Sequence, residues 1–159
     1  MEIKSPLSRE TYQLLGAALY WAEGSKTNDL AITNSDPYLI AFMVKWFQKI
    51  FNVPPKTMKA HLNIHPQQNE KEIKNFWSDL TGIPLERFGK SFIKPPNKYY
   101  KKNNLYYGTI KIRVSKGTDM RHRIFGWIKA SLQDMKPKVE LKQNKWMRLT
   151  ENQRPPANL

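Results

Sequence analysis

The sequence predicts an α+β domain in which helices cover one face of an open, mainly antiparallel sheet. Segments with the 3.6-residue apolar period of helices alternate along the chain with short segments of period two. Two of the period-two segments, 56–66 and 105–114, are apolar on one side only, as in strands with one buried face. At 159 residues, 40% of them hydrophobic, the chain is long enough for one domain with its own core.

Seven elements are expected within this domain. In chain order they are a helix over 8–23, a strand over 29–34, a helix over 37–52, a strand over 56–66, a helix over 70–80, a β-hairpin with a long basic tip over 90–116, and a helix over 119–135, with Leu132 and Met135 among its inward residues. Ser8 is the expected N-cap of the first helix, and Gly24 ends it. Asp36 caps the second helix, with Pro37 at its first position.

These elements place the domain boundary near residue 135. Residues 1–135 form the predicted domain, and 136–159 form a basic C-terminal tail. The tail is expected to be either a short helix around Trp146 or a loose basic arm. No segment of the chain repeats another, so the domain is present once.

The charge of the chain predicts a polyanionic partner. The formal net charge is +14, which indicates nucleic acid as the partner. The chain has no cysteines, which excludes disulfides and thiolate metal sites. No run of about 18 apolar residues is present, so no segment is expected to span a membrane. An anionic membrane surface is the alternative polyanion, but it usually requires a basic amphipathic helix and no clean one is present, so no membrane partner is expected. Because the first residues also lack the apolar core of a secretory signal, we expect a cytoplasmic or organellar-matrix protein that is not secreted.

The first predicted helix carries a stripe of small residues that ends in a carboxylate. Ala18 and Ala22 are four residues apart, flanked by Leu15 and Leu19, and Glu23 follows at the end of the helix. Small residues at this spacing let two helix backbones approach closely, so these four residues are the predicted interface of a homodimer. Two Glu23 carboxylates would then repel each other near a two-fold axis, and a divalent cation would remove that penalty.

The polar faces of the two alternating strands form a second candidate surface. A two-stranded ribbon fits the major groove of DNA, where these side chains either read base edges or contact only phosphates. The candidate DNA-binding residues are Lys26, Lys59, His61, Asn63, His65, Lys94, Lys98, Lys101, Lys102, Thr109, Lys111 and Arg113. Lys111 is central on its strand and either stabilises charge at the scissile phosphate or simply contacts a phosphate. His61 and His65 lack a convincing third ligand for zinc.

The segment LGAALYWAEG, residues 15–24, resembles the LAGLIDADG motif of homing endonucleases. Aligning Gly24 with the last glycine of the motif places Glu23 at the acidic, metal-binding position. Ala22 then falls at the small residue whose main-chain carbonyl helps to hold the metal, and Ala18 at the first glycine. The following EGSK…ITNSDP and the order of helices and strands up to the last core helix are also similar to single-motif members of the family.

This resemblance implies a saddle-shaped DNA-binding sheet with helices on its other face, and a homodimer because only one motif is present. It implies a meganuclease that cleaves double-stranded DNA at specific sites with Mg²⁺, or another divalent cation such as Mn²⁺ or Ca²⁺, and without an organic cofactor. Glu23 and Ala22 would be the metal ligands, and Glu23 and Lys111 the catalytic residues. Trp21 departs from the motif, and its ring is expected to be buried in its own subunit.

Two other functions remain open at this point. The chain would serve either as a non-catalytic DNA-binding regulator on the same fold or as an RNA-binding protein that assists splicing.

Overall fold

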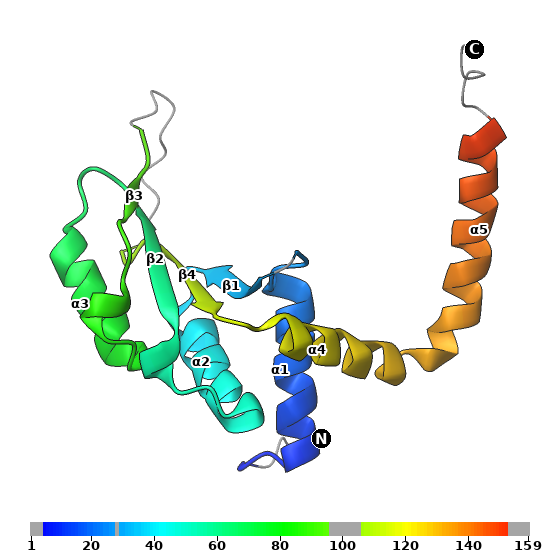
Figure 1. The fold of residues 1–159 in the computed structure, drawn as a ribbon, viewed down its shortest axis with the longest axis horizontal. Helices are drawn as coiled ribbons and strands as arrows, with labels where there is room; N and C mark the ends of the chain where they lie inside the picture. The colour runs from blue at the N-terminus through cyan, green and yellow to red at the C-terminus, as the bar shows by residue number, and fades with distance from the viewer. Residues whose placement is uncertain (1–4, 28, 96–105, 153–159) are drawn as a thin grey trace.

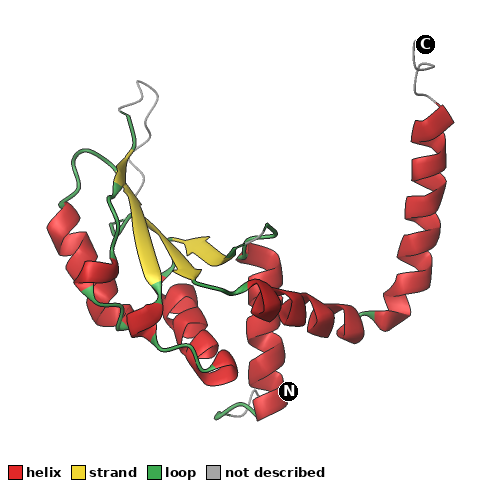
Figure 2. Ribbon diagram, viewed as in Figure 1, coloured by secondary structure: helices red, strands yellow, loops and turns green. Residues whose placement is uncertain are grey.

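The computed structural model describes residues 5–27, 29–95 and 106–152, with side chains described up to residue 149. Within these ranges the chain is α+β, with five α-helices and one four-stranded mixed sheet (Figures 1 and 2). The elements in chain order are α1 (Arg9–Glu23), β1 (Leu30–Asn34), α2 (Pro37–Phe51), β2 (Lys59–Ile64), α3 (Glu70–Thr81), β3 (Phe92–Ile93), β4 (Thr109–Val114), α4 (Thr118–Ser131) and α5 (Lys136–Asn152). Three short 3-10 helices connect them: η1 (Pro55–Thr57), η2 (Leu85–Arg87) and η3 (Gln133–Met135).

The first three helices begin where their capping residues predict. The Ser8 hydroxyl accepts a hydrogen bond from the backbone N–H of Thr11 at 3.1 Å. The Asp36 carboxylate accepts one from the second residue of α2, and Pro37 takes the first helical position. Asn69 caps α3 in the same way. These local bonds satisfy backbone donors that have no partner inside the helix, so the sequence alone locates these helix starts.

The strands are ordered β1-β4-β2-β3 across the sheet. β4 pairs antiparallel with both β1 and β2, and β3 pairs parallel with β2. The predicted hairpin over 90–116 is therefore wrong, because its first arm, β3, lies beside β2 instead of β4. The alternation over 105–114 identifies β4, although the predicted arm begins too early, because residues 106 and 107 form a turn. Alternation also carries no information about which strand is the neighbour. The tip predicted for the hairpin lies outside the described residues.

One face of the sheet is buried beneath the helices. Its buried side chains pack in a single core with Tyr20 of α1, Trp46 of α2, Trp77 of α3 and Ile124 of α4, and Figure 2 shows these helices on one side of the strands. The buried residues of this face are Leu30, Ile32, Ala60, Leu62, Ile64, Ile110, Ile112 and Val114. The prediction of helices on one face only is confirmed for this part of the chain.

We call the other face the open face of the sheet. By strand register it consists of Ala31, Thr33, Lys59, His61, Asn63, Phe92, Thr109, Lys111 and Arg113. Lys59, His61 and Lys111 are exposed on it. The sequence therefore leaves a row of cationic side chains uncovered by any described helix.

The C-terminal part of the chain differs from its prediction. α4 ends at Ser131, where the backbone of Leu132 leaves the helical region, and η3 and then α5 follow. Leu132 and Met135 are 39% and 51% exposed, so the prediction that both face the core is wrong. They lie past the end of α4, beyond the part of that helix which packs on the core. α5 has 17 residues and is longer than the predicted short helix.

No described helix has the length and apolar character needed to cross a membrane.

Candidate functional site

α1 has one face inside the protein and one outside. Gly16, Ala17 and Tyr20 are buried, whereas the outer face of α1 consists of Leu14, Leu15, Ala18, Trp21 and Ala22, all of them exposed. Leu15 is 41% exposed and Leu14 is 44% exposed, although both are large apolar side chains. α1 therefore presents an apolar face, with small residues at its centre, that no described segment of the chain covers.

Two side chains of α1 lie differently from the sequence prediction. Trp21 is 47% exposed, so the prediction that its ring is buried is wrong. It precedes Ala22 by one residue and therefore lies about 100° around the helix from it. The ring borders the small-residue stripe instead of covering it. Leu19 packs partly against its own core and lies at the opposite border of the stripe.

α1 is held against the core through a glycine. A Cβ atom at Gly16 would overlap the indole ring of Trp46. In the space left by the missing side chain, Trp46 Nε1 donates a hydrogen bond to the backbone oxygen of Tyr12 at 3.1 Å. This close approach fixes how α1 is rotated, and so which residues form its outer face.

Glu23 is the last residue of α1, and its side chain is exposed. The N–H of Gly24 donates the last helical hydrogen bond, to the Tyr20 backbone oxygen at 2.6 Å, and the helix ends because the backbone of Gly24 is extended. A Cβ atom on Gly24 would lie 2.6 Å from the Tyr20 ring. Close packing is therefore the reason for a glycine at this position. Backbone conformation is not the reason, because a φ of −79° suits any residue.

The phenol of Tyr20 fixes the chain that follows Glu23. It donates a hydrogen bond to the backbone oxygen of Ser25 at 2.9 Å and accepts one from the N–H of Ala31 at 3.3 Å. Burial raises the pKa of Tyr20 above its ordinary value, and the hydrogen bond from Ala31 opposes this less strongly. The neutral phenol therefore ties the segment after α1 to β1.

This segment runs antiparallel to β1, where Gly24 forms a bridge with Ile32. Glu23 is the last helical residue before this bridge, and Thr33, which follows Ile32, pairs with Lys111 of β4. The structure thus places Glu23 at the edge of the sheet, beside the row that Thr33 and Lys111 form across it.

Asn34 orients Glu23, and the sequence analysis missed this role. Asn34 Nδ2 donates a hydrogen bond to Glu23 Oε2 at 3.3 Å. Its other amide atom, Oδ1, accepts from the N–H groups of Ser35 and Asp36 at 2.8 and 2.9 Å, which fixes the amide plane. An asparagine just before a Ser-Asp-Pro helix start is a recognisable turn signal, but its contact with Glu23 is not local.

The row continues across the open face of the sheet to His61, which pairs with Lys111. In the next row Lys59 pairs with Arg113. Arg113 also forms a salt bridge with Asp29 at 2.9 Å, so part of its charge is already compensated.

The remaining polar residues on the open face are less exposed. Asn63 and Thr109 pair with each other and are half-buried. Together with Lys59, His61, Lys111 and Arg113 they occupy the strand face that the sequence predicts to be polar.

His65 is not on that face. β2 ends at Ile64, and the N–H of His65 donates to Gln68 Oε1 at 2.8 Å in the turn beyond. The strand prediction therefore extends too far, because Pro66 cannot donate to a sheet partner. His61 and His65 consequently do not share a strand face.

The other predicted basic contacts are spread along the chain. Lys26 lies next to the end of α1, where its ammonium donates to the Gly24 backbone oxygen at 2.9 Å. Lys94 is exposed just after β3, and its N–H donates to the Ile64 backbone oxygen at 2.9 Å. Lys98, Lys101 and Lys102 lie outside the described residues.

One chain supplies few metal ligands. Across residues 5–27, 29–95 and 106–149, no group of three or more histidine, cysteine, aspartate or glutamate side chains could hold a metal ion. The Glu23 carboxylate and the Ala22 main-chain carbonyl, in the last turn of α1, are hard oxygen donors of the kind that Mg²⁺ takes. Two such donors do not by themselves make a metal site in one copy of the chain.

Comparisons of the chain with protein-family models, with curated proteins and with solved structures give no match. We therefore infer function from the motif and the geometry alone.

Proposed function

We propose that the chain is a LAGLIDADG-type homing endonuclease that cleaves double-stranded DNA as a metal-dependent homodimer. One observation carries the proposal: α1 presents an exposed apolar face with small residues at its centre, and the same helix ends in Glu23 beside the edge of the sheet. A face of this kind is costly to leave in water, and a carboxylate at a helix C-terminus is disfavoured by the helix dipole. Both the exposed apolar face and the position of Glu23 are explained if a second copy of the chain packs against α1.

The outer face of α1 suits a second copy of itself. Ala18 and Ala22 at its centre allow two helix backbones to approach, and Leu14, Leu15 and Trp21 would be covered around them. A two-fold axis makes such a contact self-complementary. It would bring two Glu23 carboxylates and two Ala22 carbonyls together, which completes the oxygen donor set that one chain lacks.

The open face of the sheet supports duplex DNA as the substrate. Lys59, Lys111 and His61 are exposed side by side on it, and such a cationic strand surface suits the phosphates that border a groove. Asn63 and Thr109 are polar neighbours able to contact base edges. The formal net charge of +14 adds a long-range attraction for the same polyanion.

Glu23 and the Ala22 carbonyl would hold Mg²⁺, or Mn²⁺ or Ca²⁺ in its place. When bound, such an ion supplies a more acidic water and stabilises charge on a phosphate oxygen. Asn34 keeps the Glu23 carboxylate turned toward the sheet. Lys111, in the row beside Glu23, would stabilise charge on the scissile phosphate.

Replacing Glu23 tests the catalytic role. The protein is incubated with a randomised duplex library and Mg²⁺, alongside Glu23→Gln and a control, Glu10→Gln. Glu10 is an exposed acid in the first turn of the same helix, far from the site. Losing a metal ligand removes several kcal/mol of transition-state stabilisation, so Glu23→Gln should cut about a thousandfold more slowly. Glu10→Gln should cut as fast as the natural protein.

Other outcomes would assign a different function. Selective binding of duplex DNA that is never cut would identify the non-catalytic regulator, and preference for structured RNA would identify the splicing protein. Ala18→Arg tests the dimer in sedimentation experiments, because a long cation at the centre of the outer face would separate two copies. A natural protein that remains monomeric with and without DNA would contradict the proposal.

A further inference from the structure

α5 is rich in basic residues. Within Lys136–Asn152 there are five basic and two acidic residues. Four of the basic residues are spaced by four, three and three positions, which places them in one row along the helix. We call this row the α5 stripe; it consists of Lys138, Lys142, Lys145 and Arg148.

No described ion pair neutralises the α5 stripe. Glu140 lies two residues from both Lys138 and Lys142, so it is nearly opposite them on the helix. It interacts instead with Lys136, at 3.8 Å, and both of these side chains are largely exposed. Among the side chains described up to residue 149, the cations of the stripe therefore have no acidic partner.

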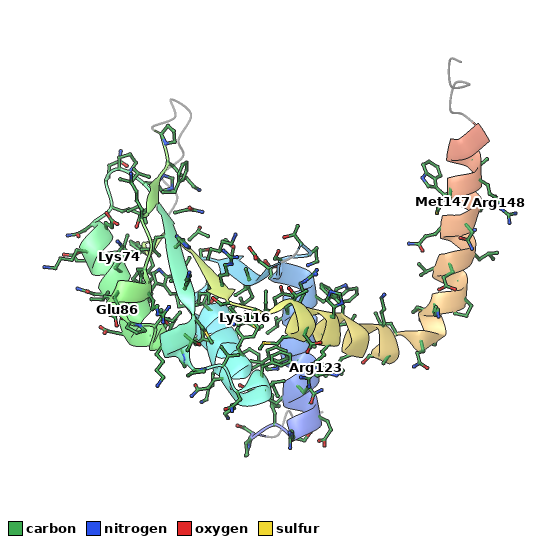
Figure 3. The ribbon with its side chains drawn as sticks, viewed as in Figure 1. Lys74, Glu86, Lys116, Arg123, Met147 and Arg148 are labelled. Atoms are coloured by element: carbon green, nitrogen blue, oxygen red, sulfur yellow. The ribbon has the colours of Figure 1, made fainter. Side chains whose placement is uncertain are left out.

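α5 stands apart from the rest of the fold. Figure 1 shows it rising beyond the end of α4, away from the sheet, with α1 and α4 between them. Every side chain of α5 described up to Leu149 is exposed. Figure 3 shows Arg148 on the side of α5 that is turned away from the sheet, and Met147 on the opposite side. A helix with so few contacts to its own fold gains little from that position unless a partner binds it.

We propose that α5 is a second DNA-binding element, an arm whose stripe binds the phosphate backbone of a duplex on the side of α5 that is turned away from the sheet. The inference rests on the proposed function for the identity of the polyanion. Residues 138–148 extend about 15 Å along the helix, and a duplex carries about nine phosphate charges over that length. The arm adds affinity without sequence selectivity, because phosphate contacts position a protein and do not read bases.

The test compares two sets of matched substitutions in the full chain. The arm variant carries Lys138→Gln, Lys142→Gln, Lys145→Gln and Arg148→Gln. The control variant also replaces three lysines and one arginine, through Lys45→Gln, Lys56→Gln, Lys71→Gln and Arg9→Gln. These control positions are exposed on α2, η1, α3 and the first turn of α1, outside the strands that form the open face of the sheet.

Affinity for a 40-base-pair duplex of random sequence is measured over a range of salt concentrations. The slope of log affinity against log salt falls by about 0.9 for each phosphate that the protein no longer neutralises. The slope of the arm variant should therefore be smaller by between about one and four units, and this variant should bind at least tenfold more weakly at low salt. The slope of the control variant should change by less than about one unit. Circular dichroism is used to check that both variants fold. We expect them to fold because none of the substituted side chains lies in the buried core.

The possible failures can be told apart. If the natural protein does not bind duplex DNA, the proposed function and the arm both fail. If it binds DNA and the arm variant keeps the slope of the control, only the arm fails. If the stripe substitutions instead reduce binding to vesicles containing phosphatidylserine, the partner of α5 is an anionic membrane and the inference is wrong. A lower slope in a protein that never cuts DNA supports the arm and contradicts the nuclease.

Discussion

Replacing Gly16 by alanine tests how α1 is placed on the core. Gly16 lies in the middle of α1, where alanine normally stabilises a helix by about 1 kcal/mol over glycine. Here the added methyl group would overlap the ring of Trp46, which is completely buried in the core. The two effects oppose each other, so the sign of the change reports on the packing of α1.

The packing effect should dominate. Forcing extra volume into a packed core costs about 1–3 kcal/mol. Moving the Trp46 ring also breaks its hydrogen bond to Tyr12, which contributes about 1 kcal/mol. After subtracting the helix preference of alanine, Gly16→Ala should destabilise the protein by about 1–3 kcal/mol.

Gly126 provides a matched control in α4. It is exposed, and a Cβ atom there would have no neighbour within 4 Å. The same substitution should therefore stabilise the protein by up to about 1 kcal/mol, through helix preference alone.

Thermal unfolding followed by circular dichroism measures both variants. For a chain of this length about 1 kcal/mol shifts the Tm by about 2–4 °C, so Gly16→Ala should lower the Tm and Gly126→Ala should raise it. If Gly16→Ala is as stable as Gly126→Ala, Trp46 does not pack under α1. The outer face of α1 would then be assigned incorrectly, together with the position of Glu23.

Two further predictions concern side chains that hydrogen-bond to a carboxylate. Asn34→Ala removes the donor to Glu23 and the acceptor at the start of α2. It should lower the free energy of unfolding by about 1 kcal/mol and slow cleavage about tenfold or more at limiting Mg²⁺. An unchanged cleavage rate would show that Asn34 does not orient the carboxylate. The hydrogen bonds from Lys74 and then from Ser91 lower the pKa of Glu70. A lowered pKa stabilises the folded protein above the ordinary value of 4.5, and this contribution disappears as the pH falls through the folded-state pKa. Ser91→Ala should therefore raise the pKa of Glu70 in an NMR titration. The variant should be less stable than the natural protein at neutral pH, and this difference should shrink as Glu70 becomes protonated in acid. An unchanged pKa of Glu70 would contradict the 2.7 Å bond from Ser91.

Local signals in the sequence predict the helices well. The start of α2 is determined by Asp36 and Pro37, whose effects act within one helical turn. The buried and polar faces of β2 and β4 follow directly from the two-residue alternation of their side chains. These features depend on neighbours in the sequence, so one chain is enough to identify them.

Strand pairing and the ends of helices could not be predicted in the same way. β3 has only two residues, so it carries no alternation, and its place beside β2 is decided by the fold as a whole. The end of α4 has no glycine or proline to mark it, and Gln133 through Met135 are compatible with a helix. The exposure of Leu132 therefore depends on where the core ends, which the helical period does not show.

The candidate site combines both kinds of information. Glu23 is identified by its place at the end of an apolar helix, which is a local pattern. Its neighbours Thr33, Asn34 and Lys111 cannot be connected to it from the sequence, because that connection requires the register between the end of α1, β1 and β4. A motif can thus identify a reactive group while leaving its surroundings unknown.

The position of Glu23 explains how one chain tolerates a carboxylate at the negative end of a helix. The helix dipole disfavours such a charge by about 0.3–1 kcal/mol when it is exposed to solvent. The amide of Asn34 offsets part of that cost, and the ammonium of Lys26 lies at the same helix end. A single chain therefore needs no metal to fold. In the proposed dimer the cost rises only when two carboxylates meet, and at that point the same two carboxylates can share a cation.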